Sequence, residues 1–443
     1  MTQDAARFDR TDSWSFATTM ALVLAIYLFT MPPNLTLVWS GIFSTGAMYS
    51  GVPFTGGYPV WTIYSWPFIH LLPFSNIAWR VGVGSAVAAA VACGLITLMV
   101  SRSGKIILGD MPAFARLRTS EQNLLRGVCG CVAGLVFGSS RAVWSEAIVG
   151  EFWALGFLLF ASVLCLFTRW FFEPAQKRRL YAALFLCGLL LTNNQELLVP
   201  LPGLICGVML ADGKLGRDVA LLVLPLAAVA TGGNQWSVWI DFPTKPNWPM
   251  LAAFLATMLM GAALALKSRR IGSEWKAAIL SGLFLVLGLS FYLYVPIASM
   301  TNPPVNWGYP RTVEGFLHTI SRGQFEKIRP TDDVGLFANQ LWWFTRATGR
   351  EFGWLYLVPA SLPFCFICSL NRVGRNWLLG LLAMFLCAGP FLMATMNPPL
   401  DAQAMDFLKP CFAAPFVVLA MCLGLGLTLV GAVLTRPSAA SVP

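Results

Sequence analysis

Two acidic side chains with clear chemical potential stand in one short segment, GSSRAVWSEAIVGEFWAL. It contains Glu146 and Glu151, five residues apart, with Arg141 just before them. A carboxylate beside an apolar, membrane-like stretch is costly, and such residues usually serve a function. We therefore choose Glu151 as the first candidate for a site carboxylate. The alternative is that both acids cap a helix start, where the helix dipole favours negative charge.

A second polar cluster interrupts an apolar stretch at TNNQE, residues 192–196. Three amide side chains, Asn193, Asn194 and Gln195, stand beside one acid. Together they offer donors and acceptors suited to sugar hydroxyls or a lipid headgroup. The alternative is a polar turn between two helices.

Basic side chains gather in a long hydrophilic segment, residues 299–350. A guanidinium group offers a bidentate fork to phosphate oxygens, so these side chains are candidates for phosphate binding. The candidates are Arg311, Arg322, Lys327 and Arg329. For each of them the alternative is a solvated surface charge.

The sequence offers little for a metal ion or an organic cofactor. Its two histidines, His70 and His318, are far apart in the chain, whereas metal sites gather several ligands. The pair Asp332 and Asp333 is more typical of a helix N-terminus than of a cation site. Walker, GxGxxG and GxSxG signatures are absent from the sequence. We predict no bound metal and no cofactor.

Membrane helices must position these groups. Of the 443 residues, 57% are hydrophobic and 11% are charged, which is more apolar surface than a soluble core can hide. Apolar runs long enough to cross about 30 Å of hydrocarbon recur along the chain. We therefore predict an all-α polytopic protein that forms a single integral membrane domain over residues 1–443.

We predict about twelve membrane-spanning helices. Their approximate positions are 14–38, 77–100, 124–140, 151–172, 180–193, 197–211, 219–231, 249–266, 277–298, 352–370, 376–396 and 411–433. The segments 180–193 and 197–211 are short and nearly contiguous. We interpret them as tilted or half-length helices that meet inside the protein.

Lysine and arginine in the connecting loops predict the orientation, because such loops are retained in the cytoplasm. An even number of spans places both termini on one side, and a cytoplasmic N-terminus collects most basic loops on that side. The net charge of +10 then reflects topology and contact with anionic lipid, and we expect no nucleic-acid partner. Residues 299–350 become a long outer loop, on the same side as the turn that holds Glu146.

The first outer segment, Trp39–Pro59, reads WSGIFSTGAMYSGVPFTGGYP. Its glycines and prolines permit tight turns and its aromatic residues suit a membrane surface, so we predict irregular structure instead of a helix. No Asp or Glu occurs between Asp12 and Asp110. This segment therefore has no carboxylate of its own.

Several segments resemble, in order, one large bacterial membrane family, labelled domain of unknown function 2723. The run GVPFTGGYPVWTIYSWPFIHLLPFSNIAWRVGVGSAVAAA resembles its GVPHPPGYPL…PFGNIAWRVNLLSA, and VWSEAIVGEFWAL resembles its WSQAVIAEVYAL. LTNNQELLVPLPGL and YLYVPIASMTNPPVNWGYP are similar to its later segments, so the resemblance extends over residues 14–330. That family is in turn similar to the GT-C glycosyltransferases, which include protein O-mannosyltransferases.

The resemblance implies a GT-C-like transferase of the bacterial inner membrane, with both termini cytoplasmic. It implies that a polyprenyl-phosphate sugar is the donor on the outer face and that a protein or glycan is the acceptor. Under this hypothesis the catalytic carboxylate is Glu151 or Glu146, and Arg141 and Arg322 bind the phosphate. The sugar pocket is expected to comprise Asn193, Asn194, Gln195, Tyr58, Asn306 and Trp307.

The chain departs from the family at several titratable positions. Trp39 and Ile42 stand where the family tends to have acids, and Phe54, Asn194 and Tyr309 replace its histidines and a further acid. We keep two hypotheses: a transferase with a replacement carboxylate, and a non-catalytic GT-C-like partner or scaffold of cell-envelope glycan assembly. A transporter is a weaker third, because the sequence has neither an intramembrane charge pathway nor paired repeats.

Overall fold

The computed structural model describes residues 8–36, 39–109, 111–232, 259–264, 266, 272–325 and 329–435. Within these ranges the regular structure is helical. Extended pairing there is limited to one parallel bridge between Val52 and Asn306. The predicted all-α class is therefore confirmed for the described residues.

Six helical segments of the described residues are long and apolar enough to cross a membrane. They are α1 (Arg10–Thr30), α4 (Ile77–Leu108), α8 (Trp153–Phe172), the stretch Trp275–Met300 with α13 (Trp275–Leu289) and α14 (Tyr294–Met300), the stretch Arg372–Met396 with α18 (Arg372–Leu386) and α19 (Leu392–Met396), and α21 (Ala414–Leu434). A bend of 70° separates α6 (Thr119–Ser139) from α7 (Arg141–Ala147), which add a seventh if they form one broken span. These helices indicate a multi-pass membrane protein.

Other helices occupy several of the remaining predicted spans. They are α9 (Lys177–Asn193), α10 (Leu201–Ala211), α11 (Gly213–Gly232) and α17 (Trp354–Cys365). The 3-10 turn η1 (Gln195–Leu198) separates α9 from α10, as the TNNQE segment predicts. The predicted span 249–266 lies largely outside the described residues. The count of about twelve spans therefore stays a prediction.

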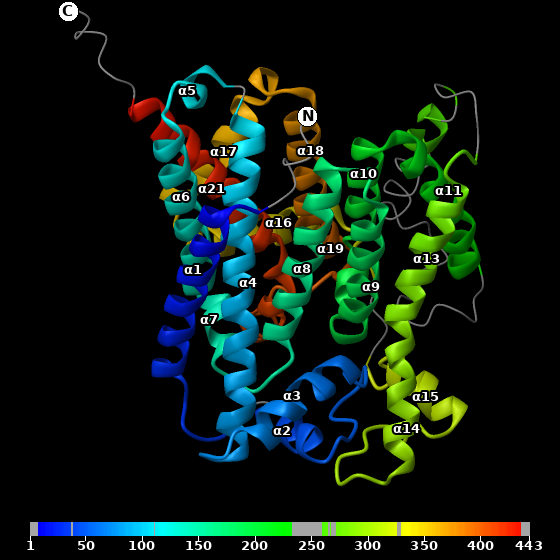
Figure 1. Ribbon diagram of the computed structural model, residues 1–443. Helices are drawn as coiled ribbons and strands as arrows, with labels where there is room; N and C mark the ends of the chain where they lie inside the picture. The colour runs from blue at the N-terminus through cyan, green and yellow to red at the C-terminus, as the bar shows by residue number, and fades with distance from the viewer. Residues whose placement is uncertain are drawn as a thin grey trace, which may run out of the picture.

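The long helix α4 is central to the bundle, with α1, α6, α8 and α21 packed against it. On the other side of the molecule, α13 packs against α9. The beginning of α1 and the end of α21 lie at one end of the bundle (Figure 1). At the opposite end, α2 (Ser40–Met48), α3 (Pro59–Leu71), α14 and α15 (Val313–Ile320) form a layer that we call the end layer.

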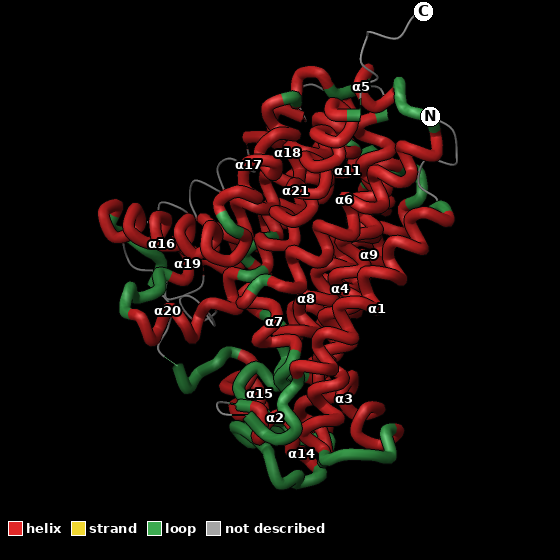
Figure 2. The backbone as a smooth tube through the Cα atoms, turned by 90° about the vertical axis from the view of Figure 1, so that its left-hand side faces the viewer, coloured by secondary structure: helices red, strands yellow, loops and turns green. Residues whose placement is uncertain are grey.

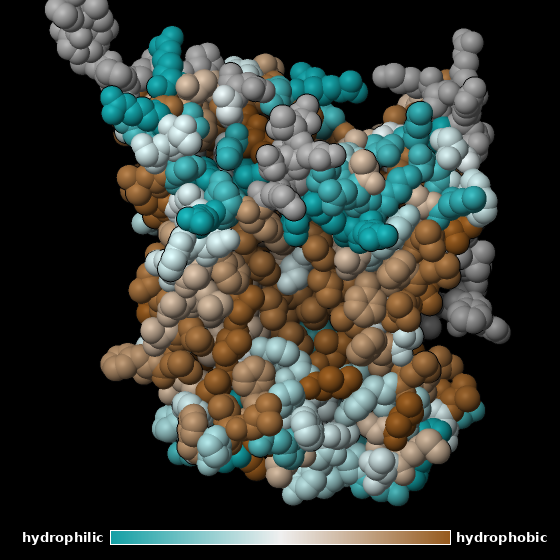
Figure 3. Space-filling model, in the orientation of Figure 1, coloured by the Kyte–Doolittle hydropathy of each residue, from teal (hydrophilic) through white to brown (hydrophobic). Residues whose placement is uncertain are grey.

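Three further helices lie next to the end layer. In Figure 2, α16 (Val334–Phe352), α19 and α20 (Ala402–Leu408) lie together on one flank of the bundle, next to this layer. Hydrophobic side chains form a belt around the middle of the face shown in Figure 3, between a hydrophilic cap and the mixed surface of the end layer. This distribution is typical of a protein that crosses a lipid bilayer.

Small residues allow α4 and α6 to approach each other closely. A Cβ atom on Gly134 would lie 2.4 Å from Oγ1 of Thr97, and one on Gly130 would lie 2.8 Å from the Thr97 carbonyl oxygen. The Thr97 hydroxyl also donates to the Gly130 carbonyl at 3.0 Å. In lipid, where apolar burial does little to join helices, such close packing and hydrogen bonding stabilise the pair.

The first outer segment differs from our prediction of irregular structure, because Ser40–Met48 forms helix α2. Gly46 faces the following turn, and a Cβ atom there would lie 2.7 Å from Cβ of Pro53. Gly46 therefore allows helix α2 and the following turn to approach each other closely. Composition alone cannot tell a glycine with this role from a glycine in a turn. Residues 51–58 are non-helical, as predicted.

Backbone hydrogen bonds join this segment to the predicted outer loop 299–350. The N–H of Val52 donates to the Val305 carbonyl at 3.0 Å, and that of Gly56 donates to the Thr319 carbonyl at 2.8 Å. The two segments therefore lie side by side. Residues 299–350 also contain α15 and most of α16, so much of the segment is helical.

A buried ion-pair network fixes the opposite end of the bundle. The side chains of Asp12 on α1 and Arg126 on α6 have no exposed surface, and their Oδ1 and Nη1 atoms are 2.5 Å apart. Asp9 pairs with Nη2 of the same arginine at 2.5 Å. Ser101 on α4 donates its hydroxyl to Asp12 at 2.7 Å. Three helices are thus joined through one carboxylate.

We expect Arg126→Leu to destabilise the fold, because the buried Asp12 would lose the nearer of two counter-ions and keep Arg102, whose Nη1 lies 3.8 Å from its Oδ2. Breaking such a pair costs about 3–5 kcal/mol, so the thermal unfolding midpoint in detergent should fall by several degrees or more. Arg116→Leu removes an exposed arginine and is the matched control, with little expected change. A similar midpoint for the two variants would contradict this role of the network.

Candidate functional site

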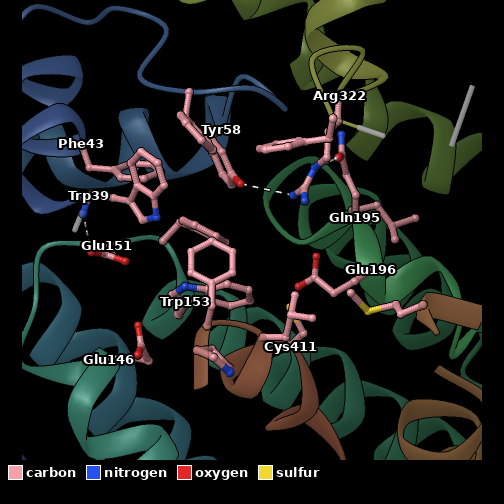
Figure 4. Close-up of a pocket in the computed structure, with 18 of the residues that line it drawn as sticks. Trp39, Phe43, Tyr58, Glu146, Glu151, Trp153, Gln195, Glu196, Arg322 and Cys411 are labelled. Carbon is pink, nitrogen blue, oxygen red and sulfur yellow. Dashed lines mark hydrogen bonds between the residues drawn. The ribbon is translucent and has the colours of Figure 1, made fainter. Parts of the chain in front are cut away.

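A cavity of about 1670 Å³ is bounded by the end layer, the α7–α8 turn, η1 and the α19–α20 region. Most of its lining side chains are apolar or aromatic. The charged ones among the described residues are Glu146, Glu151, Glu196, Arg322 and Asp406. Figure 4 shows Glu146 and Glu151 on one side, across the space from Arg322. The cavity is larger than the roughly 300–1,000 Å³ of most small-molecule sites.

Glu151 lies in the non-helical turn between α7 and α8, and its residue is only 6% exposed. Its Oε1 accepts a hydrogen bond from the backbone N–H of Trp39 at 3.3 Å. Its carbonyl accepts from Nε1 of Trp61 at 3.1 Å and from Oγ of Ser85 at 3.3 Å. The N-cap of α8 is Phe152, and no side-chain cap hydrogen bond is made there.

Burial raises the pKa of the Glu151 carboxyl group from 4.5 to about 7, although the Trp39 N–H lowers it. A carboxyl group with a pKa near neutrality exchanges protons readily at physiological pH, as a general base must. Glu146, half-buried near the end of α7, lines the same cavity. Its Oε1 accepts from the Ser145 hydroxyl at 3.3 Å.

Arg322 follows α15 and faces the cavity from the other side. Its Nε donates to Oε1 of Gln195 at 2.9 Å, and its Nη2 donates to the hydroxyl of Tyr58 at 3.3 Å. Gln195 is held in turn, because its Nε2 donates to the Tyr292 hydroxyl at 2.5 Å and to the Ile320 carbonyl at 3.1 Å. Three segments far apart in the sequence thus orient one guanidinium group.

The turn that carries Tyr58 depends on glycine. Gly56 and Gly57 have φ values of 92° and 76°, and a Cβ atom on Gly57 would lie 2.6 Å from Cγ2 of Val295. Tyr58 and Arg322 themselves have φ values of 46° and 51°, a region that costs a non-glycine residue about 1–3 kcal/mol. Tertiary contacts therefore hold both ends of the Tyr58–Arg322 bond in place.

The side chains of Asn193 and Asn194, at the end of α9, support the wall and are not part of the cavity lining. Asn193 is buried, and its Nδ2 donates to the Phe152 carbonyl at 3.1 Å and to Oδ1 of Asn194 at 2.6 Å. Nδ2 of Asn194 donates to Oε1 of Glu196 at 2.6 Å. A chain of amides therefore connects the α7–α8 turn to the acid of η1.

Aromatic side chains form the wall between the two polar sides. The ring of Phe54 lies 4.5 Å from that of Trp39 and 4.9 Å from that of Trp307, centroid to centroid. Tyr58 packs on Phe152 at 4.3 Å. Aromatic faces of this kind, next to carboxylates and amides, suit the apolar faces and hydroxyl groups of a sugar.

The structure brings together half of the predicted site residues. Those that line the cavity are Glu146, Glu151, Arg322, Gln195 and Tyr58. Arg141 is exposed at the start of α7, outside the lining. Asn193 and Asn194 lie behind the wall, Trp307 contacts it through Phe54, and Asn306 donates to the Ser299 carbonyl at 3.2 Å.

Several cavity residues were not predicted. Glu196 and Asp406 add carboxylates, and Tyr292 and Cys411 add polar atoms. Glu196 belongs to the TNNQE cluster, which the sequence does single out as polar. The predicted pocket residues of that cluster were the three amides beside it. Asp406 and Cys411 lie in segments whose spacing carries no comparable pattern.

The described residues contain no group of three His, Cys, Asp or Glu side chains that could hold a metal ion. Asp333 caps α16, because its Oδ1 accepts from the N–H groups of Gly335 and Leu336 at 2.7 and 3.2 Å. The interpretation of the Asp332–Asp333 pair as a helix N-terminus is therefore confirmed.

We expect Glu151→Gln to change how stability depends on pH. The folded protein keeps a proton on Glu151 between about pH 4.5 and 7 that the unfolded chain releases, so the free energy of unfolding should fall as pH rises through this window. The full shift corresponds to roughly 3 kcal/mol. Glutamine cannot ionise, so thermal midpoints of the variant should fall less between about pH 5 and pH 8.

Glu314→Gln is the control for that comparison, because Glu314 is an exposed acid in the first turn of α15. It should retain the pH profile of the wild type. Identical profiles for Glu151→Gln and the wild type would show that this carboxyl group does not titrate as its burial requires.

Comparison with known proteins identifies relatives of one part of the chain. Residues 40–217 match the family described as Protein O-mannosyl-transferase TMEM260 N-terminal domain. Over 182 residues the chain is 29% identical to Protein O-mannosyl-transferase TMEM260 of Mus musculus. The aligned region is 40% of this chain and 23% of the mouse protein. No solved structure matches the chain. These similarities relate part of the chain, less than half of its length, to an O-mannosyltransferase-like family, and the chain spans about a quarter of the mouse protein.

Proposed function

We propose that this protein is a GT-C-like membrane glycosyltransferase, related to the domain of unknown function 2723 family, that takes a sugar from a polyprenyl phosphate. The acceptor is a protein or glycan on the outer face of a bacterial inner membrane. The chain has about twelve spans, with both termini in the cytoplasm. No metal ion or organic cofactor takes part in this proposal.

The observation that carries the proposal is the cavity itself. Two carboxylates, Glu146 and Glu151, and one guanidinium group, Arg322, line a single space whose other lining is mainly apolar. A polyprenyl-phosphate sugar has the matching parts: an apolar chain, a phosphate anion and a sugar ring. The volume of about 1670 Å³ suits a ligand larger than a free sugar.

Each part of the cavity has a role in this proposal. Arg322 binds the phosphate and stabilises the charge that grows on it as the bond to the sugar breaks. Glu151 accepts the proton of the acceptor hydroxyl as that oxygen attacks the sugar. Trp39 and Phe54 offer faces for the sugar ring, and the apolar lining receives the lipid chain.

The arrangement of the helices supports the outer-face location. The end layer, which contributes to the cavity wall, lies at the end of the bundle opposite the beginning of α1 (Figure 1). If the N-terminus is cytoplasmic, as the basic loops predict, the end layer and the cavity belong to the outer side. This is the side on which a polyprenyl-linked donor would be used.

One observation favours the alternative of a non-catalytic GT-C-like partner or scaffold. The first outer segment has Trp39 and Ile42 where the family resemblance leads us to expect acids. The Trp39 backbone N–H also engages Glu151, the carboxylate that would replace them. The proposed transferase therefore depends on Glu151 being available to the acceptor.

We expect the purified protein to transfer sugar from a polyprenyl-phosphate donor, with a rate that rises with pH through about 7 because the base must be ionised. Glu151→Gln should lower the transfer rate by about 10²- to 10⁴-fold, the usual contribution of a general base. The assay follows radiolabelled sugar passing from donor to acceptor glycan or protein.

Glu314 is an exposed acid on α15. The control variant Glu314→Gln should therefore retain the wild-type transfer rate. Equal absence of transfer by the wild type and by Glu151→Gln, across a set of polyprenyl-phosphate sugars, would contradict the transferase. Binding of the donor without transfer would favour the non-catalytic alternative.

A further inference from the structure

Glu196 is a charged group of the cavity that has no role in the reaction proposed above. It lies in the η1 turn and is half-buried. Asn194 donates to its Oε1 at 2.6 Å, which fixes the orientation of the carboxyl group. Figure 4 shows this group pointing into the cavity, on the same side as Gln195 and Arg322.

The surroundings of Glu196 contain one cation among the described residues. The titratable groups that interact electrostatically with it are Arg322 after α15, Tyr58 before α3, Tyr292 in the 3-10 turn η2 (Ser290–Leu293) and Cys411 after α20. Burial raises the pKa of Tyr58 and of Cys411, so both are neutral at physiological pH. Of these groups, Arg322 and Glu196 are the ones that can carry opposite charges.

Arg322 keeps donor capacity for an anion. A guanidinium group has five N–H donors, and the bonds to Gln195 and Tyr58 start from Nε and Nη2. A phosphate oxygen that meets the other N–H groups brings a second negative charge next to Glu196. Two anions close together in a buried site repel each other strongly, which favours protonation of the carboxylate.

We infer that Glu196 is the counter-ion of Arg322 in the ligand-free cavity and takes up one proton from solvent when a phosphodiester anion binds to Arg322. The inference rests on the proposed function and adds its regulation: the carboxylate becomes a neutral carboxyl group, whose O–H can donate to a phosphate oxygen. Departure of the anion returns the proton to solvent. Donor binding is thereby coupled to pH through a residue that does not touch the acceptor.

Two physical observations support this coupling. Burial raises the pKa of Glu196 above its ordinary value, against the smaller opposing effects of the Arg322 charge and the Asn194 hydrogen bond. The fixed Asn194 bond occupies Oε1, which leaves Oε2 as the oxygen that receives the proton.

The test measures binding of a farnesyl methyl phosphodiester to the full-length protein in nanodiscs between about pH 5.5 and pH 8.5. Its single phosphate proton is lost far below this range, so the probe does not titrate. The dissociation constant of the wild type should rise with pH, with a limiting slope of about tenfold per pH unit for one proton. Glu196→Gln should flatten this dependence, and the matched control Glu314→Gln should retain it.

Titration calorimetry of the wild type in two buffers of different ionisation enthalpy supplies a second measurement, which needs no folded variant. It should show net uptake of up to one proton per phosphodiester bound near neutral pH. Zero uptake, or the same pH dependence in Glu196→Gln and wild type, would overturn the inference while leaving donor binding intact. If the phosphodiester binds no better than farnesol at any pH, the proposed function fails together with the inference.

Discussion

The site depends on how one buried, non-helical turn satisfies its backbone polar groups. Irregular backbone next to membrane helices is stable only where the protein itself provides hydrogen-bond partners. Between α7 and α8 the Glu151 carbonyl is bonded by Trp61 of α3 and Ser85 of α4, and the Phe152 carbonyl is bonded by Asn193 of α9. Three helices therefore hold the turn, and the turn holds the Glu151 carboxyl group at the cavity wall.

The two polar sides of the cavity are positioned by different means. The carboxylate side is fixed by the helix bundle through the α7–α8 turn. The cationic side is fixed by the end layer together with η1. The Gly56–Thr319 bond joins two distant segments of the end layer, and Tyr58 before α3 and Gln195 of η1 orient Arg322. Any movement of the end layer relative to the bundle would change the distance between the Glu151 side and the Arg322 side of the cavity. Catalysis by this site therefore requires that the end layer and the bundle stay in one arrangement around the ligand.

The sequence was most informative where apolar runs were long. The helices α4, α8 and α21 agree with predicted spans because about twenty consecutive apolar residues leave few alternatives. Helix α2 was missed because Gly41 and Gly46 look like turn residues until Pro53 is placed against the latter. Spacing alone cannot reveal such a tertiary contact.

For the candidate site residues, too, the sequence predicted chemical type better than position in the fold. Glu146, Glu151 and Arg322 were chosen for their chemical type, and they line one cavity. Within TNNQE, the sequence could not tell which side chain points inward, because η1 rotates Gln195 and Glu196 toward the cavity and leaves Asn193 and Asn194 behind the wall. Arg141 has the right charge but lies on the exposed side of α7.

The central claim is that one ligand occupies the space between Glu151 and Arg322. The most direct measurement is an electron cryo-microscopy structure of the full-length protein with a non-transferable phosphonate analogue of a polyprenyl-phosphate sugar. The account predicts phosphonate oxygens within hydrogen-bonding distance of the Arg322 guanidinium, with the sugar on the side of Glu151 and Trp39. An analogue bound elsewhere, or with its phosphonate turned away from Arg322, would contradict it.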